Sequence, residues 1–345
     1  MTERPAGRDL DATLANPRAE RVKKVAALAG RSARSRAGLF LVEGPQAARE
    51  AVRFAAPRVR DLYITPDAAA RYREIVTSAQ DAGIYLHFGT DEVLHAMSPD
   101  CQGVLAVVET VAPSLDEVFS GAGDAAGTSA GAGEGTGADA GGAGVADGGL
   151  VAAGDGVASS GASGPVGYGP VAILCEARDP GNVGTIIRVA SAAGARAVIL
   201  AGDSVDTENP KVVRASVGAV FHVPVVRGVT LEDAVSAARA AGLRVRATDG
   251  SGETELKAAR GSAKGGQGDA ANDAANDAAN DAAKDPASLP TAPTPTVWVF
   301  GNEAHGLSPE ELALADDVVR IPMPGPTESL NLASAVTLCL YSGLL

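Results

Sequence analysis

Five polar residues of this chain follow closely on apolar runs that are typical of strands. The runs are 171–175, 297–300 and 318–321, and each leads into a turn that contains glycine or proline. The polar residues that come after them are Asn182, Arg188, Glu303, Ser329 and Asn331. Open α/β sheets bind ligands at the C-terminal ends of their strands, so the pattern predicts one site for these side chains. Amides and a carboxylate can position a polar substrate, and a guanidinium can stabilise negative charge that develops on it.

The loop that leads to Ser329 and Asn331 is stiff. Three prolines between 322 and 326 fix φ and remove backbone donors, while Gly325 permits a turn that other residues make at a cost. Ser329 or Asn331 can cap the apolar helix that follows. A purely structural interpretation therefore stays open, in which Asn331 is an N-cap and nothing more.

The predicted helix after Asp179 has an apolar face and a polar face. Asn182 and Arg188 lie six residues apart on the polar side. The apolar side consists of Val183, Ile186, Ile187 and Ala190. For Arg188 the structural alternative is a surface ion pair with Glu176 or Asp179.

Alternating strands and helices predict an α/β fold in both halves of the chain. In the N-terminal half we expect strands at 39–43, 62–64, 84–87 and 104–108 and helices at 46–54, 68–82 and 91–97. In the C-terminal half we expect further strands at 197–200, 223–226 and 243–247, with a helix at 231–241. The continuous apolar strands of the second half are typical of a buried parallel sheet.

Composition divides the chain into domains and connecting segments. Residues 1–17 have no clear period and are predicted to be a flexible tail, and residues 18–111 form the first domain. Residues 112–169 are mostly Gly, Ala, Ser and Asp, which cannot bury enough apolar surface to fold, so a disordered linker is expected. Residues 170–345 form the second domain, with a low-complexity insertion at 262–296.

Three ordered motifs resemble those of the SpoU (TrmH-type) RNA 2′-O-ribose methyltransferases of the SPOUT superfamily. They are 173–188, 297–307 and 321–335. Phe40-Leu-Val-Glu-Gly44 and Ser98-Pro-Asp-Cys-Gln-Gly-Val104 look like the L30e-like substrate-binding domain that often precedes this catalytic domain. The resemblance implies a small L30e-like domain, then a mostly parallel SPOUT sheet with a C-terminal trefoil knot. It also implies homodimers and S-adenosyl-L-methionine as the cofactor.

The resemblance also implies a role for each candidate residue. Arg188 matches the catalytic arginine, and Asn182, Glu303, Ser329 and Asn331 match the other polar positions. Gly301, Ile321 and Leu330 match the cofactor-binding positions, where backbone groups hold the cofactor. A guanidinium keeps its proton at neutral pH and is a poor base, so we expect Arg188 to stabilise a phosphate or an alkoxide.

The charge distribution favours an RNA partner despite a net charge of −13. Residues 1–60 hold 13 Lys or Arg against 6 Asp or Glu, a net of +7, and a basic stretch of this kind suits phosphate contact. The candidate RNA-binding residues are Arg31, Arg34, Arg36, Lys211 and Arg214. A basic helix that is merely solvated is the alternative.

Composition argues against several other classes of protein. Three cysteines without paired spacing and four scattered histidines predict neither a disulfide frame nor a metal site. No run approaches 18 apolar residues, so no membrane partner is expected and a cytoplasmic location is predicted. The resemblance to the SpoU family therefore implies a 2′-O-methyltransferase acting on RNA, with 23S ribosomal RNA as the leading substrate. Transfer RNA is the first alternative, and a catalytically silent RNA-binding protein of the same fold is the second.

Overall fold

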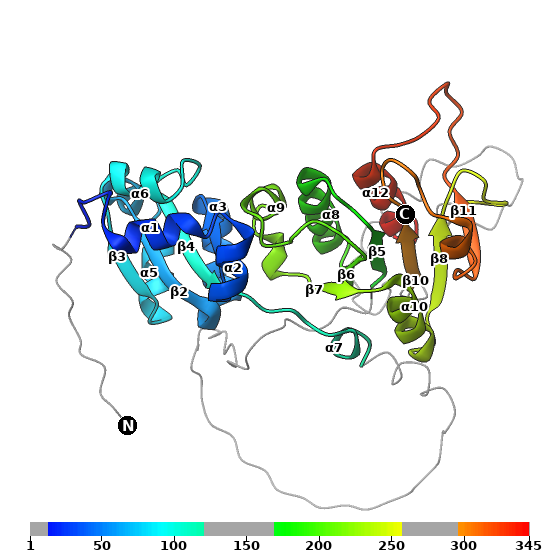
Figure 1. The fold of residues 1–345 in the computed structure, drawn as a ribbon, viewed down its shortest axis with the longest axis horizontal. Helices are drawn as coiled ribbons and strands as arrows, with labels where there is room; N and C mark the ends of the chain where they lie inside the picture. The colour runs from blue at the N-terminus through cyan, green and yellow to red at the C-terminus, as the bar shows by residue number, and fades with distance from the viewer. Residues whose placement is uncertain (1–12, 121–168, 257–295, 345) are drawn as a thin grey trace, which may run out of the picture.

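The computed structural model describes residues 13–120, 169–256 and 296–344, which form two α/β units joined side by side (Figure 1). We call residues 13–114 the head and residues 169–344 the C-terminal domain. The insertion expected at 262–296 lies outside the described residues, apart from its last residue. No helix in the described ranges is long and apolar enough to cross a membrane.

The head is built on a four-stranded sheet in the order β1-β4-β2-β3, in which only β2 and β3 are parallel. Its strands are β1 (Leu39–Glu43), β2 (Val59–Ile64), β3 (Tyr85–Phe88) and β4 (Val104–Glu109). Its helices are α1 (Glu20–Ala27), α2 (Arg31–Ala37), α3 (Pro45–Phe54), η1 (Ala56–Arg58), α4 (Pro66–Arg71), α5 (Arg73–Asp81) and α6 (Asp91–Met97). Apolar clusters lie on both faces of the sheet, so the head has its own core.

The C-terminal domain contains a seven-stranded, fully parallel sheet in the order β7-β6-β5-β10-β8-β11-β9. Its strands are β5 (Val171–Cys175), β6 (Ala197–Ala201), β7 (Val225–Val229), β8 (Arg244–Thr248), β9 (Thr254–Glu255), β10 (Thr296–Phe300) and β11 (Asp317–Arg320). Its helices are α8 (Pro180–Ala192), α9 (Pro210–Ser216), η3 (Ala219–Phe221), α10 (Leu231–Ala240), α11 (Pro309–Leu312) and α12 (Leu332–Tyr341). The predicted parallel sheet is therefore confirmed.

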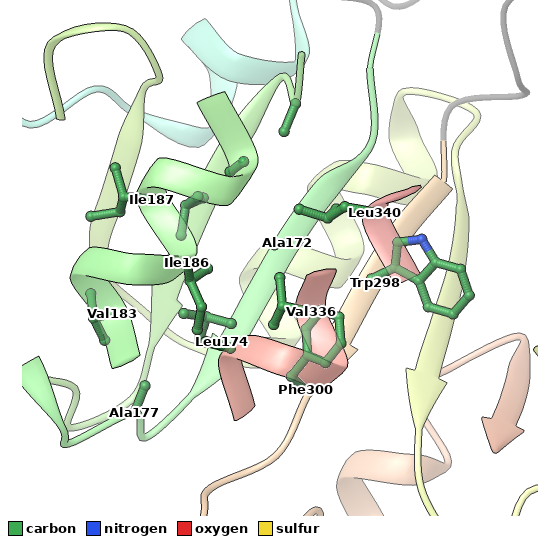
Figure 2. Packing of buried hydrophobic residues seen from close by; sticks show 14 of the residues in the cluster. Ala172, Leu174, Ala177, Val183, Ile186, Ile187, Trp298, Phe300, Val336 and Leu340 are labelled. Atoms are coloured by element: carbon green, nitrogen blue, oxygen red, sulfur yellow. The ribbon is translucent and has the colours of Figure 1, made fainter. Parts of the chain in front are cut away.

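Helices α8 and α12 cover one face of this sheet and hold the site in place. Figure 2 shows Ile186 of α8 and Val336 of α12 meeting over Leu174 and Phe300 of the neighbouring strands β5 and β10. All four side chains are at most 1% exposed, and burying each aliphatic chain stabilises the fold by about 1.5–3 kcal/mol. The opposite face is covered by α10 and by α7 (Leu115–Phe119).

Two predicted flexible segments are partly ordered. The backbone of Leu14 pairs with the edge of the head sheet, donating to Phe88 O at 2.7 Å and accepting from Thr90 N at 3.0 Å. The linker prediction is wrong for α7, which Ser114 and Glu117 begin with a reciprocal capping box. Its Val118 and Phe119 are buried among the residues of the C-terminal domain. The composition of residues 112–169 as a whole did not indicate this helix, because most residues of that segment are small or polar.

Helix boundaries in the head also differ from the prediction. The helix expected over 68–82 breaks into α4 and α5 at Tyr72, whose φ of −115° and ψ of 54° are not helical. The basic stretch forms two short helices separated by Gly30, which is extended at φ −91° and ψ 137°. Within the second of these helices, Arg34 is buried whereas Arg31 and Arg36 are exposed.

Candidate active site

The candidate site lies at the point where the order of the parallel strands reverses. Strands β5 and β10 are neighbours, while β6 and β7 continue the sheet on one side and β8 and β11 on the other. The loops that leave the C-terminal ends of β5 and β10 diverge there, which opens a crevice for ligands in sheets of this kind. The loop after β11 crosses back over this edge, since α12 packs against α8 and β10.

Three polar side chains from three separate motifs form a hydrogen-bonded chain here, which we call the amide relay. Asn331 Nδ2 donates to Asn182 Oδ1 at 3.0 Å, and Asn182 Nδ2 donates to Glu303 Oε1 at 3.2 Å. The first of these hydrogen bonds joins residues that are 149 positions apart in the sequence, and the second joins residues that are 121 positions apart. The relay confirms the predicted proximity of Asn182, Glu303 and Asn331.

The direction of the relay is fixed by the start of α12. Asn331 Oδ1 accepts from the backbone N–H groups of Ala333 and Ser334 at 2.9 and 3.4 Å, as an N-cap does. Its amino group must therefore face outward to Asn182, whose own amino group is then turned to Glu303. Asn331 is thus the N-cap of α12 and at the same time a hydrogen-bond donor to Asn182.

The loop after β10 is folded tightly on itself. Asn302 and Gly306 exchange backbone hydrogen bonds of 3.2 and 2.9 Å, and Gly306 is left-handed at φ +69°. A Cβ at Gly301 would lie 2.3 Å from the carbonyl carbon of Gly306, so only glycine fits there. Asn302 Nδ2 also donates to the carbonyl oxygen of Glu176 at 2.7 Å and joins this loop to the end of β5.

Glu176 itself has a strained backbone. Its φ of +46° lies in the left-handed region, which costs a residue with a Cβ about 1–2 kcal/mol. Two hydrogen bonds hold it there: its N–H donates to Ala201 O at 3.0 Å, and its carbonyl accepts from Asn302. Sequence reasoning did not identify Glu176 or Asn302 as site residues, although Glu176 directly follows one predicted strand and Asn302 lies two residues after another.

Arg188 stands apart from the relay. It is exposed on α8, and no hydrogen bond or ion pair joins it to any residue that the structure describes. The ion-pair alternative is not found, because Glu176 pairs with Arg178 at 3.2 Å and Asp179 accepts from Asn182 N at 2.7 Å. The guanidinium of Arg188, six residues after Asn182 on α8, is therefore available to a substrate.

The remaining predicted site residues are on the loop 321–331. Ser329 is exposed and shows no hydrogen bond to another described residue, so the structure does not bring it into the relay. Ile321 packs partly against the core, whereas Leu330 is 38% exposed. Between 322 and 330 no backbone group hydrogen-bonds to another described residue. A ligand at this loop would meet free backbone donors and acceptors beside apolar side chains.

The described cysteines near this edge are unsuited to thiol chemistry, and the described residues offer no cluster of metal ligands. Burial raises the pKa of Cys175, at the end of β5, to about 12, so its thiol stays protonated at neutral pH. Burial also raises the pKa of Cys339, in α12, to about 12. Across the described ranges no group of three or more His, Cys, Asp or Glu is placed to hold a metal ion.

The predicted RNA-binding arginines fall into two groups. Arg31, Arg36 and Lys211 are exposed, as phosphate contact requires. Arg34 is only 3% exposed and pairs with Asp206 at 2.7 Å, while also donating to two carbonyl oxygens of its own domain. Its charge is neutralised inside the protein, so the prediction that it contacts RNA is wrong.

Arg214 is likewise engaged between the two domains. Its guanidinium donates to Glu43 at 2.7 Å and to Asp100 at 2.6 Å, both in the head. We call the contact of α9, η3 and the loop before α9, which carries Asp206, with the head the junction. His222 adds a 2.9 Å contact to Glu50, and Phe221 stacks on Phe40 with ring centroids 6.3 Å apart. The structure thus gives Arg214 a junction role that its sequence context did not indicate.

Comparison with known proteins places this architecture in a family. The model of the SpoU rRNA Methylase family matches residues 170–341, and the model for RNA 2′-O ribose methyltransferase substrate binding matches residues 41–114. The chain therefore belongs to the SpoU methylase family, with the substrate-binding domain in front of the catalytic one. The predicted family is confirmed.

Two curated proteins are similar to about half of this chain. The 23S rRNA (uridine(2479)-2′-O)-methyltransferase of Streptomyces viridochromogenes is 34% identical over 168 residues, 48% of each chain. The mitochondrial rRNA methyltransferase 3A of Danio rerio is 38% identical over 190 residues, 50% of this chain and 43% of that protein. The chain thus spans about half the length of the curated relatives it matches.

A solved structure extends the likeness to the whole fold. The SpoU methyltransferase AviRb from Streptomyces viridochromogenes, in complex with the cofactor AdoMet, superposes with a TM-score of 0.62 at 27% identity. That match covers 94% of this chain and 98% of that one. The SPOUT fold predicted from the motifs is therefore confirmed.

Proposed function

We propose that this protein transfers a methyl group from S-adenosyl-L-methionine to a ribose 2′-hydroxyl of RNA, with 23S ribosomal RNA as the leading substrate. The observation that carries the proposal is the exposed guanidinium of Arg188, which has no partner among the described residues and follows Asn182 of the amide relay by six residues on α8. The names of the relatives, several of them rRNA 2′-O-methyltransferases, support the same reaction and substrate class.

The chain's own residues would act on the RNA side of the reaction. A 2′-oxygen gains negative charge as its proton leaves, and a fixed cation nearby lowers the energy of that charge. Arg188 is the cation in place for this, or for the neighbouring phosphate. The relay holds Asn182 and Glu303 in one orientation, so they can position the ribose without reorganising during the reaction.

The loop 321–331 and the turn at Gly301 suit the cofactor. The loop combines unpaired backbone groups with Ile321 and Leu330, and these would hold the adenosine portion through backbone hydrogen bonds and apolar contact. The bound cofactor supplies an electrophilic methyl group on a sulfonium. Gly301 would allow close approach at the turn, where any side chain would meet Gly306.

We further propose a homodimer, a trefoil knot around α12 and a cytoplasmic location. Leu338 on α12 is 46% exposed and Leu344 is 50% exposed, an apolar surface that suits a second copy of the chain. The return of the chain from β11 across the sheet edge to α8 supports the knot. Three free, buried cysteines suit a reducing compartment.

Mapping of 2′-O-methyl groups in cellular RNA tests the proposal directly. A 2′-O-methyl group blocks alkaline cleavage at its nucleotide, so deleting the gene should make one ribosomal RNA position cleavable, and wild-type protein should restore resistance. If the position that changes lies in transfer RNA, the substrate assignment is wrong. If no position changes, and purified protein binds S-adenosyl-L-methionine without methylating RNA, the silent RNA-binding alternative holds.

A further inference from the structure

A cavity of about 480 Å³ lies in the head, at the start of β2 and β3. Strand β3 is the edge strand of the head sheet, at the opposite edge from β1, which contacts α9 of the C-terminal domain. Figure 1 shows β3 on the side of the head that faces away from the C-terminal domain. The cavity is thus remote from both the junction and the candidate active site.

Two cations face this cavity. Arg21, from α1, and Arg60, from β2, are both exposed, and Arg60 makes no hydrogen bond or ion pair with a described residue. One carboxylate, Asp61, lies between them and His87. Apart from His87, the charges facing the cavity are therefore two positive and one negative, which favours an anion over a cation.

The histidine in the cavity is locked in place. Arg21 Nη1 can only donate, so His87 Nδ1 accepts at 3.3 Å and the ring proton is on Nε2, which donates to Asp61 Oδ1 at 2.7 Å. The ring also stacks on Tyr63, with centroids 4.9 Å apart at 24°. Tyr63 is 1% exposed and belongs to the core, so the His87 ring lies against a buried side chain.

Tyr85 offers an aromatic surface at the rim. It begins β3 and is 51% exposed, in a protein with an aromatic content of only 3%. Exposed aromatic rings beside cations are the usual platform for unpaired bases, since every base has a face that can stack. A duplex keeps its bases stacked within itself and cannot use such a ring.

We propose that this cavity binds a single unpaired nucleotide of RNA. The base stacks on Tyr85, its phosphate lies between Arg21 and Arg60, and Asp61 accepts a hydrogen bond from a base N–H group. The inference rests on the proposed function, because it takes RNA as the substrate. It adds to that function a point of contact at which the head selects single-stranded over double-stranded RNA.

Binding of short RNAs to the full chain tests the proposal. Tyr85→Ala should weaken binding of a short single-stranded RNA roughly 5- to 150-fold, the loss expected for one stacked base, and should leave binding of the matching duplex unchanged. Tyr85→Phe retains the ring and should bind as wild type. Tyr85→Ile keeps the strand propensity of an aromatic residue but has no flat face, so it should behave like Tyr85→Ala.

The arginines provide a second, independent measurement. Arg60→Ala should lower the slope of log affinity against log salt by about 0.7 for a single strand, because one phosphate contact is lost. Tyr85→Ala should leave that slope unchanged. Arg73→Ala is the matched control, since Arg73 is an exposed arginine of the same domain outside the cavity. It should change neither affinity nor slope.

The outcomes separate this proposal from the proposed function. Equal single-strand affinity for wild type, Tyr85→Ala and Tyr85→Ile would overturn the nucleotide site, even if gene deletion still removes a ribosomal 2′-O-methyl group. Loss of single-strand affinity in these two variants, in a protein whose gene deletion changes no methyl group, would uphold the site and reject the methyltransferase. Equal weakening of single-strand and duplex binding would also overturn the proposal.

Discussion

Arg188 and Arg34 carry the same charge in two regions of the molecule that use it in opposite ways. At the edge of the C-terminal sheet, Arg188 faces solvent without a partner among the described residues. At the junction, Arg34 is 3% exposed and its donors are taken up by Asp206 and two carbonyl oxygens. A guanidinium whose N–H donors are already bound to protein acceptors has few donors available for a ligand. The partners of each side chain, rather than the residue type, therefore separate the arginine proposed for catalysis from the structural one.

The largest expected effect is on turnover. Arg188→Ala should lower kcat for RNA methylation roughly 10²- to 10³-fold, because one stabilising group at the developing charge is lost. Affinity for S-adenosyl-L-methionine, measured by calorimetry, should stay near that of wild type because the cofactor residues lie on other loops. A variant that methylates at the wild-type rate would remove Arg188 from the mechanism.

The next effect is on folding and concerns the junction. Arg34→Ala removes the 2.7 Å partner of the partly buried Asp206 and leaves it only Arg227 at 3.7 Å and the Glu208 N–H, so it should lower the free energy of unfolding by about 3 kcal/mol. Arg36→Ala, an exposed residue of the same helix, should change it by less than about 0.5 kcal/mol. Urea unfolding of the two full-length variants makes the comparison. Equal stabilities would mean that the Arg34 pair does not hold the domains together.

Two substitutions of Asn331 separate its two roles. Asn331→Asp keeps an N-cap oxygen for α12 but cannot donate to Asn182, so it should retain stability and lose most methylation activity. Asn331→Ala loses both roles and should unfold about 1 kcal/mol more easily as well. Thermal unfolding and a methylation assay on both variants test this. Full activity in the aspartate variant would show that the relay only supports the helix.

The smallest expected effect is a dependence of the free energy of unfolding on pH. Burial tends to raise the pKa of Asp206, but the hydrogen bond and charge of Arg34, with Glu208 N–H and Arg227, lower it overall. Because the folded pKa is the lower one, the contribution to stability is present above the unfolded pKa and is lost as pH falls below about 4. Asp206→Asn should therefore lose less stability than wild type between neutral pH and that range in urea titrations. If wild type and Asp206→Asn lost the same stability in acid, the loss would have to come from other carboxylates.

The sequence predicted the catalytic edge better than the junction, and the reason is physical. Strand ends, caps and glycine turns are encoded locally, so Asn182, Glu303 and Asn331 could be placed at one edge from patterns of a few residues. The partners of Arg34 and Arg214 lie 172 and 171 residues away, and no local pattern pairs them. The break of the predicted helix at Tyr72 and the two-residue strand β9 also depend on tertiary contacts that no local period reveals.

Helix α7 changes how the two domains are connected. Only residues 110–114 separate the end of β4 in the head from this helix, which is packed on the C-terminal domain. Five residues span at most about 18 Å, so the head is held on a short tether at a high effective concentration, whatever the length of chain that follows. Residues 121–168 therefore do not set the reach of the head. Insertions or deletions there would leave the distance between the cavity of the head and the candidate active site unaltered.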